Sequence, residues 1–123
     1  MPIYLKRDFC GATLISPQYA ISAAHCFFDD FGPNEKVSEV EVIAGAYERE
    51  ENGKNRRKIK RLIKPYEGEI WNSTMNVHPD MVILELQSPF DIIEGLIQPA
   101  CLPSKPIKPG ARCFGSGWGY TKG

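Results

Sequence analysis

The stretch Ile21-Ser22-Ala23-Ala24-His25-Cys26 decides how this chain folds. It places a histidine beside a cysteine at the end of an apolar run, and Cys10 lies sixteen residues upstream of Cys26, directly before Gly11-Ala12-Thr13-Leu14-Ile15-Ser16. The pattern suggests two short strands joined by a disulfide, with an imidazole held rigidly next to it. Because imidazole exchanges protons near neutral pH, a histidine fixed in this way is a candidate general base.

The size and composition are those of an ordinary globular domain. The chain has 123 residues, of which 42% are hydrophobic, and its 15 basic residues balance its 15 acidic ones. A net charge of zero gives no argument for nucleic acid or an anionic membrane as a partner. No apolar run reaches the roughly 18 to 20 residues of a membrane-spanning helix, and the residues after Met1 do not have the pattern of a signal peptide.

Short strands separated by turn residues dominate the pattern. Apolar or alternating segments bounded by Gly, Pro and Asn predict strands at residues 3–6, 9–15, 19–24, 37–44 and 81–86. No internal repeat and no amphipathic helix is evident. The sequence therefore predicts an all-β fold, and a small barrel is the natural way to close such a sheet over its apolar face.

A strongly basic segment covers residues 54–64, with seven Lys or Arg in eleven positions. One interpretation is a patch that binds a polyanion. The other is the solvated face of a strand whose opposite face carries Ile59 and Ile63. The second interpretation is favoured, because acidic residues within 48–51 lie just upstream and the net charge is zero.

Asp80 is the second residue with a candidate role. It precedes the apolar run Met81–Leu84, and a carboxylate entering a buried strand needs a partner. Pairing with an imidazole would satisfy it and hold the Nδ1 tautomer. The alternative is an exposed aspartate in the turn made by Pro79. The neighbouring His78 could be imagined as a metal ligand with His25 or Asp80, but no ligand spacing supports this, so an exposed loop histidine is expected.

The four cysteines fall into two close pairs, Cys10 with Cys26 and Cys101 with Cys113. Neither pair has the C-x-x-C spacing of a zinc or redox motif. They fit an oxidised, secreted protein, and they also fit a cytosolic protein with scattered thiols. Asn72-Ser73-Thr74 matches the acceptor pattern for N-glycosylation, which would be used only in a secreted chain.

Five segments together match the pattern of a known family, in order and at suitable spacing. They are Phe9–Ser16, Ser22–Cys26, Asp80–Leu86, Gln98–Pro103, and Cys113 with Ser116–Gly119. On these segments the chain resembles the first half of a chymotrypsin/trypsin-like serine endopeptidase, the family of the Ser-His-Asp triad. The resemblance implies that His25 is the general base, that Asp80 is the carboxylate that orients it, and that Cys10 and Cys26 form the disulfide beside the histidine.

The resemblance also implies a domain division. Residues 1–98 are expected to form the N-terminal barrel of the two-barrel fold, with its first strand region truncated. Residues 99–112, which hold four of the ten prolines, are expected to form a linker. Residues 113–123 are expected to be the first strand of the second barrel, most of which is missing. In the family, the cysteines at the positions of Cys101 and Cys113 form disulfides with cysteines outside this segment. Here these two cysteines are therefore expected to be free thiols or to pair with each other.

The nucleophile of the family does not occur in this sequence. It is a serine in a Gly-Asp-Ser-Gly-Gly motif, and Ser116 lies instead at the opening of the second barrel. The oxyanion hole and the specificity pocket belong to the same missing half. The resemblance therefore implies a serine endopeptidase whose 123-residue portion is inactive alone. The alternative is a non-catalytic, protease-like binding or structural module.

The remaining expectations concern ligands, partners and location. The positions aligned with the calcium loop of some family members are Ala46, Asn52 and Asn55, so no calcium, other metal or cofactor is expected. The expected partner is a polypeptide substrate once a second barrel is present, and the exposed seam of the barrel is expected to promote self-association. By resemblance, the protein is expected to be secreted.

Overall fold

The computed structural model describes residues 2–5, 10–29, 32–33, 40–45, 55–64 and 79–117. Its elements are β1 (Pro2–Leu5), β2 (Gly11–Leu14), β3 (Tyr19–Ser22), η1 (Ala24–Cys26), β4 (Phe28–Asp29), β5 (Gly32–Pro33), β6 (Glu41–Ile43), β7 (Arg56–Ile63) and β8 (Val82–Leu86). In this part of the chain, no helix has the length and apolar character needed to cross a membrane.

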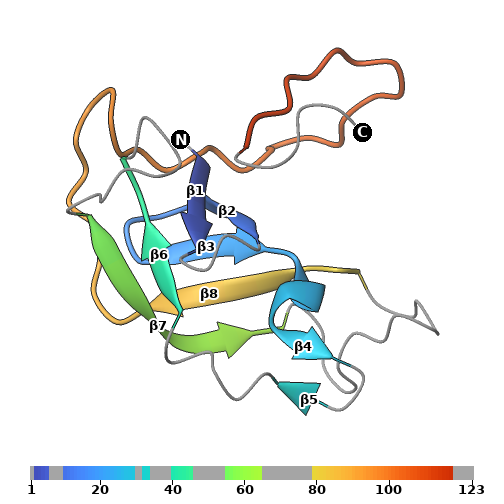
Figure 1. Ribbon diagram of the computed structural model, residues 1–123. Coiled ribbons are helices and arrows are strands. Elements are labelled where there is room, and N and C mark those ends of the chain that lie inside the picture. The colour runs from blue at the N-terminus through green and yellow to red at the C-terminus, as the bar shows by residue number, and fades with distance from the viewer. Residues whose placement is uncertain are drawn as a thin grey trace.

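Six strands form a closed antiparallel barrel in the order β1-β2-β3-β8-β7-β6 (Figure 1). Strand β1 closes it, because it pairs with β2 on one side and with β6 on the other. Closure leaves no free sheet edge and turns one face of every strand inward. Strands β4 and β5 make a separate two-stranded ribbon that follows η1. The all-β barrel predicted from the sequence is confirmed.

The core follows from the alternation of side chains along each strand. In β2 and β3 every second residue is buried, so Leu14 and Ala20, which are register partners, are 1% and 0% exposed. Leu84 of β8 lies opposite Ala20 and is also fully buried. Small residues on β2 and β3 leave room for larger ones from the other strands. The cluster comprises Ala12, Leu14, Ala20, Ala24, Phe27, Val40, Val42, Ala44, Ile59, Val82, Leu84, Leu86, Phe90 and Ile97.

An irregularity in β7 explains its basic outer surface. The register with β8 shifts between Ile59 and Arg61, which leaves Lys60 as an extra residue. Ile59 is buried, whereas Lys60 and Arg61 are both exposed and Ile63 is only half-buried. The bulge therefore interrupts the strict alternation expected from the sequence, and it presents two consecutive cations to solvent.

The strand expected at residues 19–24 ends earlier, at Ser22. Ser22 is opposite Val82, the first residue of β8, so beyond this pair β3 has no partner with which to continue the ladder. The chain instead turns into the single 3-10 turn η1. This end of β3 places His25 on a turn at the rim of the barrel, and not on a strand.

The segment that follows the barrel is hydrogen-bonded to β2 through Ala100. The backbone N–H of Ala100 donates to the carbonyl of Leu14 at 2.7 Å, and residues 101–117 are exposed throughout. Residues 113–117, the described part of the expected second-barrel strand, are not in a strand, and residues 118–123 lie outside the described ranges. The division into barrel, linker and second-barrel strand stays a prediction.

Candidate active site

His25 is presented by a turn that is anchored in the core. Backbone N–H groups of Cys26 and Phe27 donate to the carbonyls of Ala23 and Ala24 at 3.2 and 3.0 Å and close the turn. Ala24 and Phe27 are 0% and 1% exposed, whereas the side chain of His25 is 55% exposed. The two buried neighbours fix the backbone, so the imidazole stands at the surface on a rigid support.

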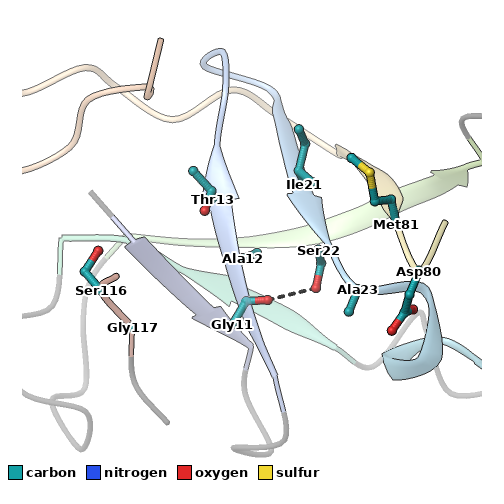
Figure 2. A pocket seen from close by; sticks show the side chains of 10 residues that line it. All are labelled: Gly11, Ala12, Thr13, Ile21, Ser22, Ala23, Asp80, Met81, Ser116 and Gly117. Carbon is teal, nitrogen blue, oxygen red and sulfur yellow. Dashed lines mark hydrogen bonds between the residues drawn. The ribbon is translucent and has the colours of Figure 1, made fainter. Parts of the chain in front are cut away.

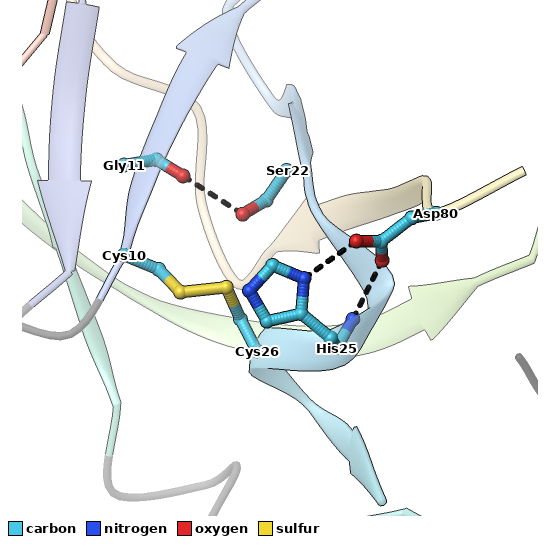
Figure 3. The surroundings of a disulfide bond; sticks show 6 residues. All are labelled: Cys10, Gly11, Ser22, His25, Cys26 and Asp80. Atoms are coloured by element: carbon cyan, nitrogen blue, oxygen red, sulfur yellow. Dashed lines mark hydrogen bonds and ion pairs between the residues drawn. A yellow bond between two sulfur atoms is a disulfide. The ribbon is translucent and has the colours of Figure 1, made fainter. Parts of the chain in front are cut away.

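Asp80 accepts two hydrogen bonds from His25, one with each carboxylate oxygen (Figure 3). Its Oδ1 lies 2.8 Å from the backbone nitrogen of His25, and its Oδ2 lies 2.5 Å from Nδ1 of the ring. Asp80 is brought there by the turn before β8, in which the N–H of Met81 donates to the carbonyl of Pro79 at 2.8 Å. Two contacts to one carboxylate fix both the position and the rotation of the ring.

The pair also has a defined protonation pattern. Burial acts to raise the pKa of Asp80, but the side-chain and backbone hydrogen bonds from His25, together with its charge, act in the opposite direction, and the net pKa lies below its ordinary value. An ionised carboxylate only accepts, so His25 must donate through Nδ1. Of the two alternatives for Asp80, the structure shows the paired one, in a turn that leaves its side chain 35% exposed.

A disulfide joins Cys10, just before β2, to Cys26, the last residue of η1 (Figure 3). The two Cα atoms are 6.3 Å apart, and the bond closes a loop with a sequence separation of 16. Beside it, the hydroxyl of Ser22 donates to the carbonyl of Gly11 at 2.8 Å. The disulfide thus ties the turn that carries His25 to the start of β2, and the hydrogen bond ties the end of β3, which leads into that turn, to the same place.

A cavity of about 360 Å³ lies against this corner of the barrel (Figure 2). Its walls come from β2, β3, the turn before β8 and the C-terminal segment. Asp80 and Met81 lie at one end of the view and Ser116 at the other, on a segment far away in sequence. Sequence reasoning did not single out Met81, which is 41% exposed; the only signal in the sequence is that it directly follows Asp80.

The other cysteines are not brought together. Cys101 and Cys113 are both exposed and free, so the alternative in which they pair with each other is not the one observed. The acceptor Asn72, His78 and the calcium-loop positions Ala46 and Asn52 lie outside the described residues. Expectations about them stay predictions.

The basic segment is partly neutralised by carboxylates that sequence reasoning did not pair with it. Glu85 of β8 is 7% exposed, and its carboxylate accepts a hydrogen bond from Nε of Arg61. The Nζ atom of Lys60 lies 3.8 Å from the other carboxylate oxygen of Glu85. The hydrogen bond from Arg61 lowers the pKa of Glu85 below its ordinary value. Arg56 lies 3.6 Å from Glu41 on β6. The sequence did offer one signal for this ion pair, namely a glutamate inside the apolar run of β8.

The remaining arginine of this strand packs on the barrel. The guanidinium of Arg57 lies 4.9 Å from the centre of the Phe90 ring, and its Nε donates to the carbonyl of Pro89 at 3.1 Å. Phe90 itself is 3% exposed and belongs to the core. These contacts support the interpretation of the segment as the outer face of a strand, since three of its arginines already have partners.

A closed six-stranded antiparallel barrel, with a hydrogen-bonded histidine and aspartate beside a disulfide at its rim, has the architecture of a serine protease barrel. The comparison with protein families agrees. The family model described as Trypsin matches residues 1–123, and the chain therefore belongs to the trypsin family of serine proteases.

Two mouse proteins illustrate the relationship. The chain is 30% identical over 124 residues to epidermal growth factor-binding protein type B of Mus musculus, and 29% identical over 124 residues to kallikrein 1-related peptidase b26 of the same organism. Each match covers 94% of this chain and 44% of the relative. The chain thus spans less than half the length of these two relatives.

Proposed function

We propose that the chain contributes the general base and its orienting carboxylate to a serine-type endopeptidase. The observation that carries the proposal is the double contact of Asp80 with His25, 2.8 Å to the backbone nitrogen and 2.5 Å to Nδ1. In acyl transfer, a histidine oriented in this way takes the proton of the nucleophilic hydroxyl on Nε2 and later delivers it to the leaving amine. The carboxylate holds the tautomer and stabilises the imidazolium.

The serine itself is proposed to come from a second barrel. No Gly-Asp-Ser-Gly-Gly motif is present among the 123 residues, and the oxyanion hole is built from backbone amides around that motif. On this proposal residues 1–98 form the first barrel, 99–112 the linker and 113–123 the start of the second. The 123-residue polypeptide by itself is then inactive, and the complete protein acts on a polypeptide substrate.

Two further features belong to the same proposal. The disulfide between Cys10 and Cys26 is the kind of crosslink that persists in an oxidising compartment, and it supports a secreted protein. Asn72 is then a glycosylation acceptor. Mass spectrometry of the secreted protein, before and after removal of N-linked glycans, tests both. An intracellular, reduced and unmodified chain would contradict them.

The exposed apolar residues of the C-terminal segment support a proposal that this segment packs against another surface. Leu102, Ile107 and Phe114 are 62%, 69% and 105% exposed. Such residues lie against another surface in stable proteins, so we propose that the 123-residue chain self-associates when it is alone. Sedimentation velocity should show dimers or larger species whose fraction falls in the Phe114→Ser variant. A monomer at all concentrations would argue against this.

The second candidate is a non-catalytic, protease-like module. The two candidates differ in what the transcript encodes beyond the Gly123 codon. A Gly-Asp-Ser-Gly-Gly motif there supports the endopeptidase. A stop codon at that point supports the module, because the His25–Asp80 pair would then have no hydroxyl to deprotonate.

Labelling with a fluorophosphonate, which reacts with activated serines, tests the endopeptidase directly. We expect no labelling of the 123-residue chain and rapid labelling of a polypeptide that includes a second barrel. In that polypeptide His25→Gln should slow labelling by at least about 10³-fold, because the base is lost. His78→Gln, the change at the chain's other histidine, should leave the rate within about twofold. Labelling of the 123-residue chain, or indifference to His25→Gln, would refute the proposal.

A further inference from the structure

Ser22 is a buried polar residue at the end of β3. Among the residues that the structure describes, the buried polar side chains are those of Ser22 and Glu85, and Ser22 is 8% exposed. Its hydroxyl donates to the carbonyl oxygen of Gly11 at 2.8 Å, which compensates for the water that it loses on burial. Ala20 and Ala24, on either side of it, are buried without any such requirement. Apolar packing alone therefore does not explain a hydroxyl at this position.

The hydroxyl continues a connection that the backbone ends. The register pairs of β2 with β3 stop at Thr13 and Ile21, and the next link between the two strands is the hydrogen bond from Ser22 to Gly11 (Figure 3). On its other side, Ser22 is the register partner of Val82, the first residue of β8. Ser22 thus joins three strands, β2 through its side chain and β8 through backbone pairing.

His25 lies between two ties that both lead to the start of β2. Before it, the hydroxyl of Ser22 holds the end of β3 to Gly11. After it, the disulfide holds Cys26 to Cys10, which is the residue next to Gly11. One attachment point leaves a segment free to rotate about it, and a second on the other side of the histidine restricts that rotation. The hydroxyl of Ser22 supplies this second attachment.

Asp80 reaches the histidine from the strand that Ser22 pairs with. It precedes Val82, the partner of Ser22, by two residues, and both Asp80 and Ser22 line the cavity at this corner (Figure 2). Its Oδ1 and Oδ2 lie 2.8 and 2.5 Å from the backbone nitrogen and Nδ1 of His25. Because His25 follows β3 and Asp80 precedes β8, a displacement of one strand end against the other changes both distances.

We propose that Ser22 is a positioning residue, whose hydroxyl sets the end of β3 and so holds His25 within hydrogen-bonding distance of Asp80. The hydroxyl hydrogen is committed to the carbonyl of Gly11, so Ser22 acts through the pair and takes no part in proton transfer. Its consequence for catalysis rests on the proposed function, since a misplacement of about 1 Å can cost about 10²-fold in rate. Its effect on the geometry of the pair does not, so the two are tested separately.

Nuclear magnetic resonance of the 123-residue chain tests the geometry without reference to proteolysis. The backbone N–H of His25 donates to Asp80, and its proton chemical shift moves upfield when this hydrogen bond lengthens. We expect an upfield shift in Ser22→Ala, in the direction set by Asp80→Ala, which removes the acceptor. The amides of Leu86 and Ile97, bonded to backbone carbonyls elsewhere in the fold, should not move. An unchanged His25 amide, or equal shifts at all three, would overturn the proposal.

Ser22→Thr and Ser22→Val separate the hydroxyl from the volume of the side chain. The two replacements have nearly the same shape, and only threonine keeps the hydroxyl. The His25 amide should stay near its parental shift in Ser22→Thr and move upfield in Ser22→Val. Chemical shifts report the folded molecules, so a loss of global stability does not imitate this result. Equal shifts in the two variants would assign the effect to volume and overturn the proposal.

Kinetics of a polypeptide completed by a second barrel tests the consequence for catalysis. Ser22→Ala should lower kcat for an ester substrate by about 10- to 100-fold with KM within about twofold, and Ser22→Thr should restore most of kcat. Ser88→Ala, at an exposed serine after β8, should change neither constant.

His25→Gln distinguishes the two ways in which this experiment can fail. If the activity of the completed polypeptide does not depend on His25, the proposed function fails, and the amide shifts still decide whether Ser22 positions the pair. If the activity depends on His25 but kcat is unchanged in Ser22→Ala, the positioning role is overturned and the proposed function stands.

Discussion

Removing the disulfide is expected to lower the free energy of unfolding by about 3 kcal/mol. The Cys10–Cys26 bond closes a loop with a sequence separation of 16. The loop-entropy relation gives a loss of about 10 cal/mol/K in the unfolded chain for a loop of this length, which is about 3 kcal/mol at 25 °C. For 123 residues the entropy of unfolding is about 260 cal/mol/K, so the same loss corresponds to a fall in Tm of about 12 °C.

The assay compares Cys10→Ser/Cys26→Ser with the parent chain by urea denaturation and thermal melting under non-reducing conditions. Cys101→Ser/Cys113→Ser is the matched control, because these two cysteines are exposed and free, and its Tm should stay within about 2 °C of the parent. A loss below about 1 kcal/mol in the disulfide variant would refute the reasoning, since it would mean that the bond does not restrict the unfolded chain. Both variants and the parent are compared at low protein concentration in the Phe114→Ser background, in which self-association is expected to be reduced.

Three further outcomes follow from the geometry. Leu84→Ala, at a fully buried core position, should destabilise the barrel by about 3 kcal/mol in urea denaturation, whereas Leu102→Ala, at a 62% exposed one, should stay within about 0.5 kcal/mol. In a polypeptide completed by a second barrel, Asp80→Asn should lower kcat for an ester or amide substrate by about 10⁴-fold, the effect known for the family's own triad, and a loss under tenfold would contradict the assigned role. The pKa of Glu85 is lowered by the hydrogen bond from Arg61, so its stabilisation is complete above the ordinary glutamate pKa and is lost as pH falls through the lower folded value. Glu85→Gln should therefore flatten the acid limb of a plot of unfolding free energy against pH, and an unchanged limb would show that other carboxylates dominate it.

The barrel was predictable because its signals are local. Alternation in β2 and β3 and the apolar run of β8 each identify a strand by a short pattern. The bulge in β7 was not predictable, because it depends on which residue of β8 lies opposite each residue of β7. The early end of β3 has the same origin: Tyr19 to Ala24 is apolar except for Ser22, and only the position of Val82 shows where pairing stops.

The site was only partly predictable for a related reason. A histidine beside a cysteine and an aspartate before an apolar strand are visible in the sequence, but the 55 residues that separate His25 from Asp80 hide their contact. Reasoning from the residues alone left Asp80 open between pairing and exposure. The resemblance to a family suggested the pair, and the coordinates show its geometry. The contact of Glu85 with Arg61 had no such guide, because it depends on the register of β7 against β8, which shifts just before Arg61.

The His25–Asp80 pair is assembled entirely within one barrel. Asp80, which lies just before β8, holds the imidazole ring by a hydrogen bond. The buried Ala24 anchors the turn that carries the ring, and the disulfide joins this turn to the residue before β2. If the proposed function holds, the base is therefore oriented before a nucleophile approaches, and its orientation carries no reorganisation cost at that step.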